Sequence, residues 1–326
     1  MIYAAAITGP TAGGKTALSL QVCRDFEAEI ISCDSMQIYK GMDIGTAKAT
    51  EQEQAVAPHH MIDVITPDLS FSAADYKKMA MPIAKDIYER GKLPLFVGGT
   101  GLYLDTIKRS FEGSAPQSSP EYRDNILKSI KCEEDKIALW QRLRSVDEQS
   151  AEQIHYNNVK RVIRAIEIYD TTGRPKSYFD QMASSPSEEI SIAHVTLDFH
   201  NRGTLYARID KRVDEMIEAG LFDEVMSLLS LGFLSADTTA SGAIGYKEII
   251  SGLAEGLSTE AIADNIKQAS RNYAKRQLTW FRHSKDAAVV FVDDEAGNIR
   301  PFDEIYSELK HTLTDFRTVK LNARST

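Results

Sequence analysis

The chain alternates between short apolar runs and longer segments with helical periodicity. Apolar runs bounded by turn residues predict buried strands, and apolar residues spaced three and four apart predict amphipathic helices. The predicted strands are residues 2–7, 29–33, 59–64, 93–97, 190–199 and 288–292. Helical patterns separate most of these runs, and Ser72 is a candidate N-cap for the helix that ends before Gly91. Strands that alternate with helices in this way predict an α/β fold built on a parallel sheet.

One long segment has helical periodicity without any predicted strand. It begins at residue 112, where a glycine and two prolines interrupt the pattern, and it ends after a Ser-Ser-Pro-Ser run. We therefore expect a helical insertion domain at 112–189. The core domain is then made of residues 1–111 and 190–326.

The first predicted strand leads into a glycine-rich loop with a phosphate-binding signature. Gly9-Pro10-Thr11-Ala12-Gly13-Gly14-Lys15-Thr16 fits the pattern G-x-x-x-x-G-K-[ST], and a helical pattern follows it as the motif requires. In such a loop the backbone N–H groups surround a phosphate, Lys15 adds a positive charge, and Thr16 offers a hydroxyl group to Mg²⁺. The sequence thus predicts a P-loop NTPase-like sheet, flanked by helices, that binds a di- or triphosphate.

Two other loops follow predicted strands at the edge where open parallel sheets bind their ligands. Asp34 comes directly after the second strand, so we expect it in the active-site crevice. Gly98-Gly99-Thr100-Gly101 follows the fourth strand and either lets the backbone approach a ligand or simply makes a tight turn. No other strand ends in the aspartate of an ordinary Walker B segment, so the metal geometry of a typical ATPase is not expected.

Positive charge is concentrated in a few segments of a chain whose formal net charge is −9. That net charge argues against coating of nucleic acid by bulk attraction, although local basic clusters can still bind RNA. Arg208 and Arg212 share one face of a predicted helix, which suits an anion, with a merely solvated face as the alternative. Residues 155–176, near the end of the insertion, form a second basic segment.

The most basic segment is 265–285, which contains no acidic residue. Lys267, Arg271 and Lys275 recur every four residues, so we expect them to form a ladder along one helix face. Tyr273 and Trp280 add aromatic surfaces on which bases can stack. This combination favours RNA binding over a solvated face.

The remaining composition narrows the class of protein. The sequence opens directly on the strand and P-loop without the pattern of a signal segment, and no apolar run approaches membrane-spanning length. We therefore expect a cytoplasmic protein with no membrane partner. Cys23, Cys33 and Cys132 are too few and too scattered for a disulfide framework or a four-ligand zinc site, and we expect reduced thiols.

Taken together, these motifs resemble those of the tRNA dimethylallyltransferase family over nearly the whole chain. The matching segments are 9–16, Asp34-Ser35-Met36-Gln37-Ile38-Tyr39, 41–48, Gly98-Gly99-Thr100, 161–167, Gly245-Tyr246-Lys247-Glu248 and 274–280. Gly13 departs from the family, because relatives often carry Ser or Val there. The zinc-finger extension of eukaryotic relatives is absent, which fits a bacterial-type enzyme.

The resemblance implies a reaction and roles for residues. A dimethylallyl group would move from dimethylallyl diphosphate to N6 of the adenosine at tRNA position 37, next to the anticodon, giving N6-isopentenyladenosine and free diphosphate. It implies that the P-loop and Arg212 bind the diphosphate in place of ATP, with Mg²⁺ at Thr16. The implied catalytic residues are Asp34, as general base, with Thr100 and Arg208.

The family likeness also implies a monomer that recognises the tRNA anticodon stem-loop, gripped by the helical insertion. The implied tRNA-binding residues are Asp34, Ser35, Met36, Gln37, Gly101, Arg123, Lys160, Arg161, Arg164, Lys267, Arg271, Lys275 and Arg276.

Three other classes of protein share part of this pattern. A small-molecule or nucleoside kinase has a P-loop and a strand-end aspartate but does not need the basic segment 265–285. A non-catalytic RNA-binding module needs that segment but neither Lys15 nor Asp34. An isopentenyltransferase that acts on free adenine nucleotides is closer, and the insertion with its basic end argues against it.

Overall fold

The computed structural model describes residues 1–109, 119–182, 185–235 and 238–322. The chain forms two compact units, Met1–Ile107 with Glu189–Thr326, and Lys108–Glu188. The second unit begins before the expected boundary at residue 112, because Arg109 already pairs with Pro186 in an isolated β-bridge. This bridge joins the two ends of the insertion to each other.

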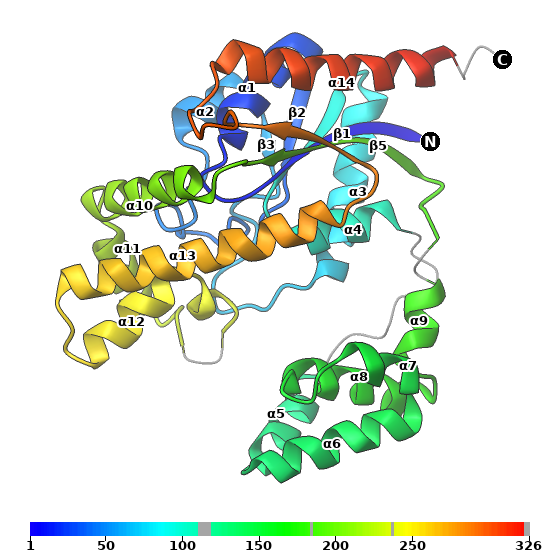
Figure 1. Cartoon of the computed structure of the whole chain (residues 1–326), viewed down its shortest axis with the longest axis vertical. Coiled ribbons are helices and arrows are strands. Elements are labelled where there is room, and N and C mark those ends of the chain that lie inside the picture. The colour runs from blue at the N-terminus through cyan, green and yellow to red at the C-terminus, as the bar shows by residue number, and fades with distance from the viewer. Residues whose placement is uncertain (110–118, 183–184, 236–237, 323–326) are drawn as a thin grey trace. The chain divides into compact units, whose positions relative to one another are not determined.

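The first unit is built on a sheet of six parallel strands in the order β3-β2-β4-β1-β5-β6 (Figure 1). Its strands are β1 (Ile2–Thr8), β2 (Ala28–Ser32), β3 (His59–His60), β4 (Leu93–Gly98), β5 (Ile190–Asp198) and β6 (Ala287–Phe291). The predicted α/β class is confirmed. Because the strands are parallel, their carboxyl ends lie along one edge, and the loops after β1, β2 and β4 meet there.

The strand β3 is shorter than the predicted run 59–64. Met61 and Asp63 adopt left-handed backbone conformations, with φ of 62° and 52°, which interrupt an extended strand. His59 hydrogen-bonds the Ala57 carbonyl through Nδ1, and His60 Nε2 lies 2.9 Å from the buried Glu29 carboxylate. The adjacent histidines therefore have structural partners. Over the described residues, no cluster of three or more His, Cys, Asp or Glu is placed to hold a metal ion.

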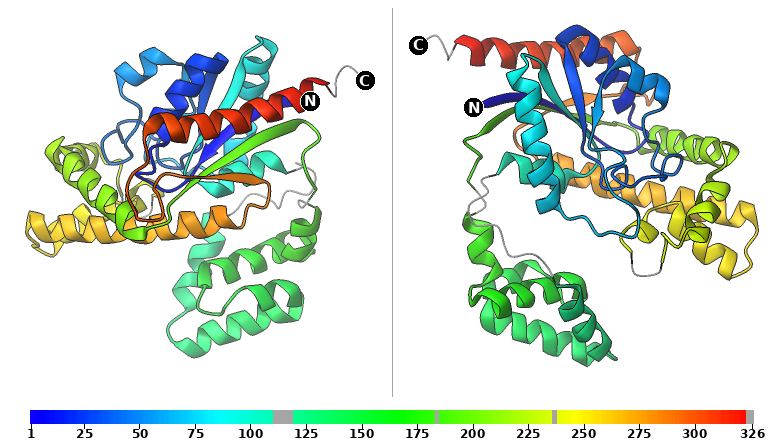
Figure 2. Two further views of the ribbon diagram at one scale, coloured as in Figure 1. Left: turned by 45° about the horizontal axis from the view of Figure 1, so that its top comes forward. Right: turned by 180° about the vertical axis from the view of Figure 1, so that it is seen from behind.

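Helices cover both faces of this sheet (Figures 1 and 2). In the first unit they are α1 (Lys15–Phe26), α2 (Glu51–Val56), α3 (Ala73–Glu89), α4 (Gly101–Lys108), α10 (Arg202–Glu218), α11 (Leu221–Ser230), the 3₁₀ helix η1 (Ala240–Gly242), α12 (Tyr246–Ala254), α13 (Thr259–Arg282) and α14 (Phe302–Asn322). The predicted cap of α3 is confirmed, because the Ser72 side chain accepts from the Asp75 N–H and the Asp75 carboxylate accepts from the Ser72 N–H.

The central strand β1 shows why the sheet needs helices on both sides. Ala4 and Ala6 belong to a core cluster formed with α3, α4, α11 and α12, whereas Ala5 and Ile7 belong to a second cluster with α1 and α14. Successive side chains of a strand point to opposite faces, so an uninterrupted apolar run must be buried on both. The apolar pattern at the start of the chain thus specifies a buried central strand.

The second unit is helical in its described part, as its periodicity predicts. Its helices are α5 (Pro120–Ser129), α6 (Glu133–Val146), α7 (Glu148–Gln153), α8 (Val159–Thr172) and α9 (Lys176–Met182). A small separate core, centred on Leu143, Val162 and Ile166, holds them together. The insertion therefore has a hydrophobic core of its own.

The three cysteines are present as thiols, as expected. Cys23, Cys33 and Cys132 are all free thiols, and burial raises the pKa of Cys23 and Cys33 to about 12. Both buried thiols are therefore protonated and unreactive at neutral pH.

Of the helices that the structure describes, none combines the length and apolar character needed to cross a bilayer.

Candidate active site

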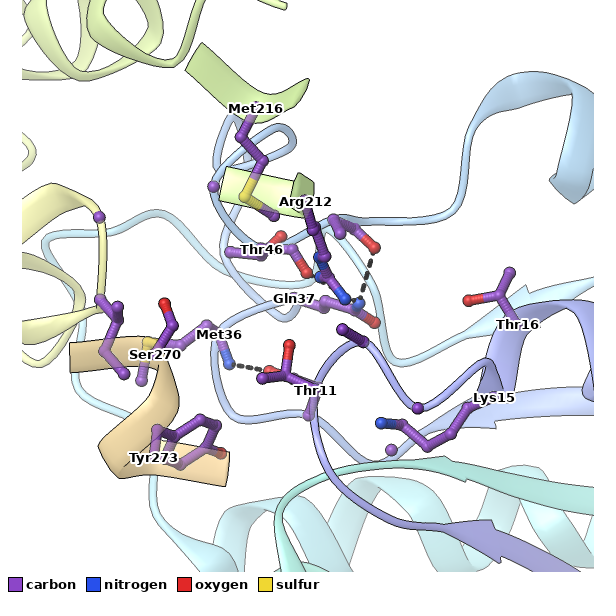
Figure 3. A pocket seen from close by; sticks show the side chains of 18 of the residues that line it. Thr11, Lys15, Thr16, Met36, Gln37, Thr46, Arg212, Met216, Ser270 and Tyr273 are labelled. Atoms are coloured by element: carbon purple, nitrogen blue, oxygen red, sulfur yellow. Dashed lines mark hydrogen bonds between the residues drawn. The ribbon is translucent and has the colours of Figure 1, made fainter. Parts of the chain in front are cut away.

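A cavity of about 600 Å³ lies at the carboxyl edge of the sheet. Its wall combines the P-loop, the loop after β2, the segment 45–49, and parts of α10 and α13. Figure 3 shows Lys15 and Thr16 together at one end, and Met216, Ser270 and Tyr273 at the other. The cavity therefore joins the P-loop to a less polar region made by distant parts of the chain.

The P-loop owes its shape to backbone conformations that few residues adopt. Gly9 has a φ of 143°, and a Cβ there would lie 2.8 Å from the Leu197 carbonyl oxygen. Ala12 is left-handed, with a φ of 58°, at a cost of about 1 kcal/mol for a residue other than glycine. The ammonium of Lys15 donates to the Gly9 and Pro10 carbonyls at 3.1 and 2.8 Å. One of its three N–H donors is left for an anion.

Three cations meet around this loop. Arg208 Nε donates to the Ala12 carbonyl at 2.9 Å, and Arg212, one turn further along α10, lines the same cavity. Burial, followed by the charge of Arg212, lowers the pKa of Lys15 to about 8, although Asp34 opposes the shift. Burial also lowers the pKa of Arg212. Lys15 and Arg212 thus repel each other in a partly desolvated site, and a bound anion relieves that repulsion.

Asp34 lies two residues after the end of β2, in the same cavity. One carboxylate oxygen accepts a hydrogen bond from the Met36 N–H at 2.9 Å. Thr100 holds both neighbours of Asp34, because its hydroxyl accepts from the Ser35 N–H and its own N–H donates to the Cys33 carbonyl, both at 3.0 Å. The structure thus fixes the backbone of Asp34, and among the described residues no hydrogen bond is made to its second carboxylate oxygen.

The second glycine-rich turn packs against protein. A Cβ on Gly98 would lie 2.1 Å from the Cys33 carbonyl oxygen, one on Gly99 2.0 Å from the side chain of Gln277, and one on Gly101 2.3 Å from the ring of Trp280. Gly98 nevertheless lines the cavity, so the approach of this turn to a ligand stays a prediction. Gly101, predicted to contact tRNA, is buried beneath Trp280 instead.

The loop after β2 has fewer available polar groups than expected. The Gln37 amide donates to the Thr46 and Ala47 carbonyls, each at 3.2 Å, and accepts from the Ser32 hydroxyl at 2.8 Å. Gln37 therefore anchors the following loop. The cavity is lined by Ser35, Met36 and Gln37, and their expected contact with RNA stays a prediction.

The basic ladder of α13 is only partly free, because α10 packs beside it. Lys267 and Arg271 lie 2.6 Å from the carboxylates of Asp214 and Asp210, respectively. Both residues are therefore paired with acids of another helix in the absence of RNA, and their binding of RNA stays a prediction. Lys275 and Arg276 are exposed and, in the described part of the chain, have no acidic partner.

The insertion also contains internal ion pairs. The buried carboxylate of Glu167 accepts from Arg123 at 3.2 Å and from Arg164 at 2.8 Å, so both arginines stabilise a buried charge. Their expected binding of tRNA stays a prediction. Lys160 and Arg161, at the start of α8, are exposed and have no ion pair among the residues that the structure describes.

The apolar end of the cavity was not identified from the sequence. Met216, Leu221, Ile244 and Ile266 line it, and Tyr273 lies beside them. Apolar residues at helical spacing usually indicate core packing, so their pattern alone could not distinguish a ligand pocket. Burial raises the pKa of the Tyr273 hydroxyl, which is therefore neutral at physiological pH.

The oxygen groups near the P-loop allow a test of the expected Mg²⁺ site. The Thr16 hydroxyl lines the cavity, and among the described residues no side chain is hydrogen-bonded to it. This hydroxyl fits Mg²⁺ that is shared with phosphate oxygens and water, the usual coordination of this ion. It does not make a complete site for the metal alone.

These features define a P-loop α/β protein whose cavity combines a cationic phosphate-type site, a carboxylate and an apolar pocket. The family described as IPP transferase matches residues 37–284 of this chain. The tRNA dimethylallyltransferase of Thermoanaerobacter sp. (strain X514) is 44% identical over 317 residues, which cover 97% of this chain and 98% of that protein. The protein of the same name from Caldanaerobacter subterraneus subsp. tengcongensis is 42% identical over 316 residues, with 97% of each covered.

Two solved structures are similar along most of the chain. The full-length tRNA isopentenylpyrophosphate transferase of Bacillus halodurans has a TM-score of 0.69 and 37% identity, and the match covers 98% of this chain and 99% of that one. A eukaryotic dimethylallyltransferase acting on tRNA has a TM-score of 0.74 and 27% identity, with 89% and 74% covered. The chain belongs to the IPP transferase family, which catalyses dimethylallyl transfer to tRNA adenosine.

Proposed function

We propose that this protein transfers the dimethylallyl group of dimethylallyl diphosphate to N6 of the adenosine at tRNA position 37. The main support is the single cavity in which Lys15, Arg208 and Arg212 adjoin Asp34 and an apolar pocket. A diphosphate requires the cations, a five-carbon prenyl group requires the apolar wall, and an amine nucleophile requires a base. The related eukaryotic enzyme acts on tRNA, which supports the acceptor.

The proposed reaction breaks the C1–O bond of the donor and forms a C1–N6 bond. The bridging oxygen keeps the bonding electrons, so negative charge grows on the diphosphate while allylic cation character grows on C1. Lys15, Arg208 and Arg212 stabilise the departing diphosphate. The adenine N6 lone pair is delocalised into the ring, and Asp34 removes the N6 proton as the new bond forms. The adenosine must first leave its stack, at a cost of a few kcal/mol.

Mg²⁺ is proposed to bind with the donor, held by the Thr16 hydroxyl and by the phosphate oxygens of the donor. When bound, it neutralises charge on the diphosphate. Calorimetric titration of the protein with Mg²⁺, with and without pyrophosphate, tests this assignment. Equal Mg²⁺ binding in both titrations would contradict a site that is completed by phosphate oxygens.

A labelling experiment distinguishes tRNA from free nucleotide as the acceptor. The protein is incubated with labelled dimethylallyl diphosphate and either a tRNA anticodon stem-loop or AMP. Label in the stem-loop alone supports the proposal. Label in AMP alone would favour the class of isopentenyltransferases that act on free adenine nucleotides, and no label in either would contradict a prenyltransferase.

The exposed cations of α13 are expected to carry the salt dependence of tRNA binding. Each phosphate contact on a single strand contributes about 0.7 to the slope of log affinity against log salt, so Lys275→Gln/Arg276→Gln should flatten that slope by about 1.4. Lys267→Gln/Arg271→Gln is the matched control, because both residues are already paired with acids of α10. Stem-loop affinity is measured at several salt concentrations. Equal flattening by both pairs would show that the internal ion pairs open on RNA.

Donor affinity is expected to fall as pH rises above about 8, the lowered pKa of Lys15. The anion binds the protonated lysine, and the unliganded protein loses that proton at lower pH than an ordinary lysine does. The terminal phosphate of dimethylallyl diphosphate is fully ionised above pH of about 7.5, since its last pKa is near 6. Calorimetry without tRNA at pH 7.5 and 9.5 measures the change, which Lys15→Met should largely abolish.

The lowered pKa of Lys15 also affects folding stability, which should rise with pH where donor affinity falls. The folded pKa of Lys15 is about 8 and the ordinary value is 10.5, so between these values the unfolded chain binds more protons. The contribution of Lys15 to the free energy of unfolding therefore rises with pH across this window. Wild type and Lys15→Met, compared by denaturant unfolding, should differ in this slope. If they do not, Lys15 titrates normally and the pH dependence of donor binding has another source.

A further inference from the structure

The side chain of Gln277 connects two glycine-rich loops of the site. It lies in α13, is 5% exposed, and belongs to the segment 274–280 that the family motif includes. Its Oε1 accepts from the Thr11 N–H of the P-loop at 2.9 Å, and its Nε2 donates to the Gly99 carbonyl at 3.0 Å. Both halves of one buried amide are thus used to join α13 to the loops after β1 and β4.

Gln277 is hydrogen-bonded to the P-loop next to a residue with an unfavourable backbone conformation. Thr11 precedes Ala12, whose left-handed backbone is unfavourable for a residue with a side chain. Gln277 holds the N–H of Thr11 from α13, while Arg208 holds the carbonyl of Ala12 from α10 at 2.9 Å. The backbone at Thr11 and Ala12 is therefore held by one side chain from each of two helices.

The side-chain amide of Gln277 packs tightly against Gly99. A Cβ at this position would lie 2.0 Å from Gln277 Nε2, so only glycine leaves room for the amide. The next residue, Thr100, holds the backbone on both sides of Asp34. Gln277 consequently sets the position of the P-loop relative to the segment that supports the proposed base.

We propose that Gln277 is a positioning residue that pre-forms the P-loop for the donor diphosphate. This inference rests on the proposed function, because it takes the P-loop as the donor site. Without the amide, the Thr11 N–H and the Gly99 carbonyl lose their partners, and the loop must be ordered by the donor itself. The effect is therefore expected on donor binding, with tRNA binding preserved.

Gln277→Met keeps the length of the side chain and removes both hydrogen bonds. We expect pyrophosphate, titrated calorimetrically with Mg²⁺, to bind about tenfold more weakly than to wild type, since two hydrogen bonds are lost. KM for dimethylallyl diphosphate should rise by a similar factor, with stem-loop affinity unchanged. Gly99→Ala, which displaces the same amide from the other side, should show the same pattern. The second variant makes the test independent of how well the first one folds.

Leu278→Ala is the matched control, because Leu278 is buried on the same helix and belongs to the apolar core. It should lower the melting temperature without raising KM for the donor. Wild-type pyrophosphate affinity in Gln277→Met would overturn the positioning role while leaving the proposed function intact. The positioning role would also be overturned if Leu278→Ala lowered the affinity for pyrophosphate equally, since a general loss of stability would then explain both results. Failure of wild type to bind pyrophosphate would overturn both proposals.

Discussion

Replacing Asp34 by Asn is expected to lower the rate of prenyl transfer by about 10² or more. The amide has the size of the carboxylate but cannot accept the N6 proton as the C–N bond forms. Asn can still accept the hydrogen bond from the Met36 N–H that Asp34 accepts at 2.9 Å, so the loop should keep its shape. Single-turnover measurement with saturating donor and stem-loop isolates the chemical step.

The control for this variant is Asp68→Asn, because Asp68 is an exposed carboxylate that does not line the cavity. It should transfer the prenyl group at the wild-type rate. Stem-loop affinity should be retained in Asp34→Asn, which separates loss of the base from loss of binding. A wild-type single-turnover rate in Asp34→Asn would exclude Asp34 as the base.

Lys15→Ala is expected to reduce kcat/KM for dimethylallyl diphosphate by about 10², the typical effect of removing one group that stabilises charge in a transition state. The ammonium is held at the P-loop by hydrogen bonds to the Gly9 and Pro10 carbonyls, and its substitution by a methyl group removes this charge from the donor site. Steady-state kinetics with varied donor and saturating tRNA measure the loss. Stem-loop affinity should not change.

Thr16→Ala provides a useful comparison, because it removes the proposed Mg²⁺ ligand and leaves Lys15 in place. Its defect should be smaller at high Mg²⁺ concentration, whereas the defect of Lys15→Ala should not depend on Mg²⁺. Normal transfer by Lys15→Ala would mean that the P-loop is not the donor site. The proposed function would then need another place for the diphosphate.

Some of this site could be predicted because its geometry is local. The P-loop is eight consecutive residues between a strand and a helix, and Asp34 follows a strand whose carboxyl end must lie at the ligand edge of a parallel sheet. Arg208 and Arg212 share a helix face by their spacing alone. None of these inferences depends on which other element packs nearby, so the structure places all of them around one cavity.

Several of the predicted site residues contact partners from distant parts of the chain. Lys267 and Arg271 have no acid in their own segment, yet α10 brings Asp214 and Asp210 to them. Gly101 has the pattern of a ligand-binding turn, but Trp280 covers it. Each of these contacts joins residues more than fifty positions apart. Sequence spacing describes only neighbours on the same element.

Periodicity and short motifs were enough to predict the fold class, the phosphate loop, the strand-end carboxylate and the family, because each of these is encoded within a few residues. The folded chain was needed to learn which cations have acidic partners, where the apolar pocket lies, and that Gln277 joins the P-loop to the turn at Gly99. Those properties depend on packing between elements, and a buried amide or an ion pair acquires its role only from the group that folding places opposite it.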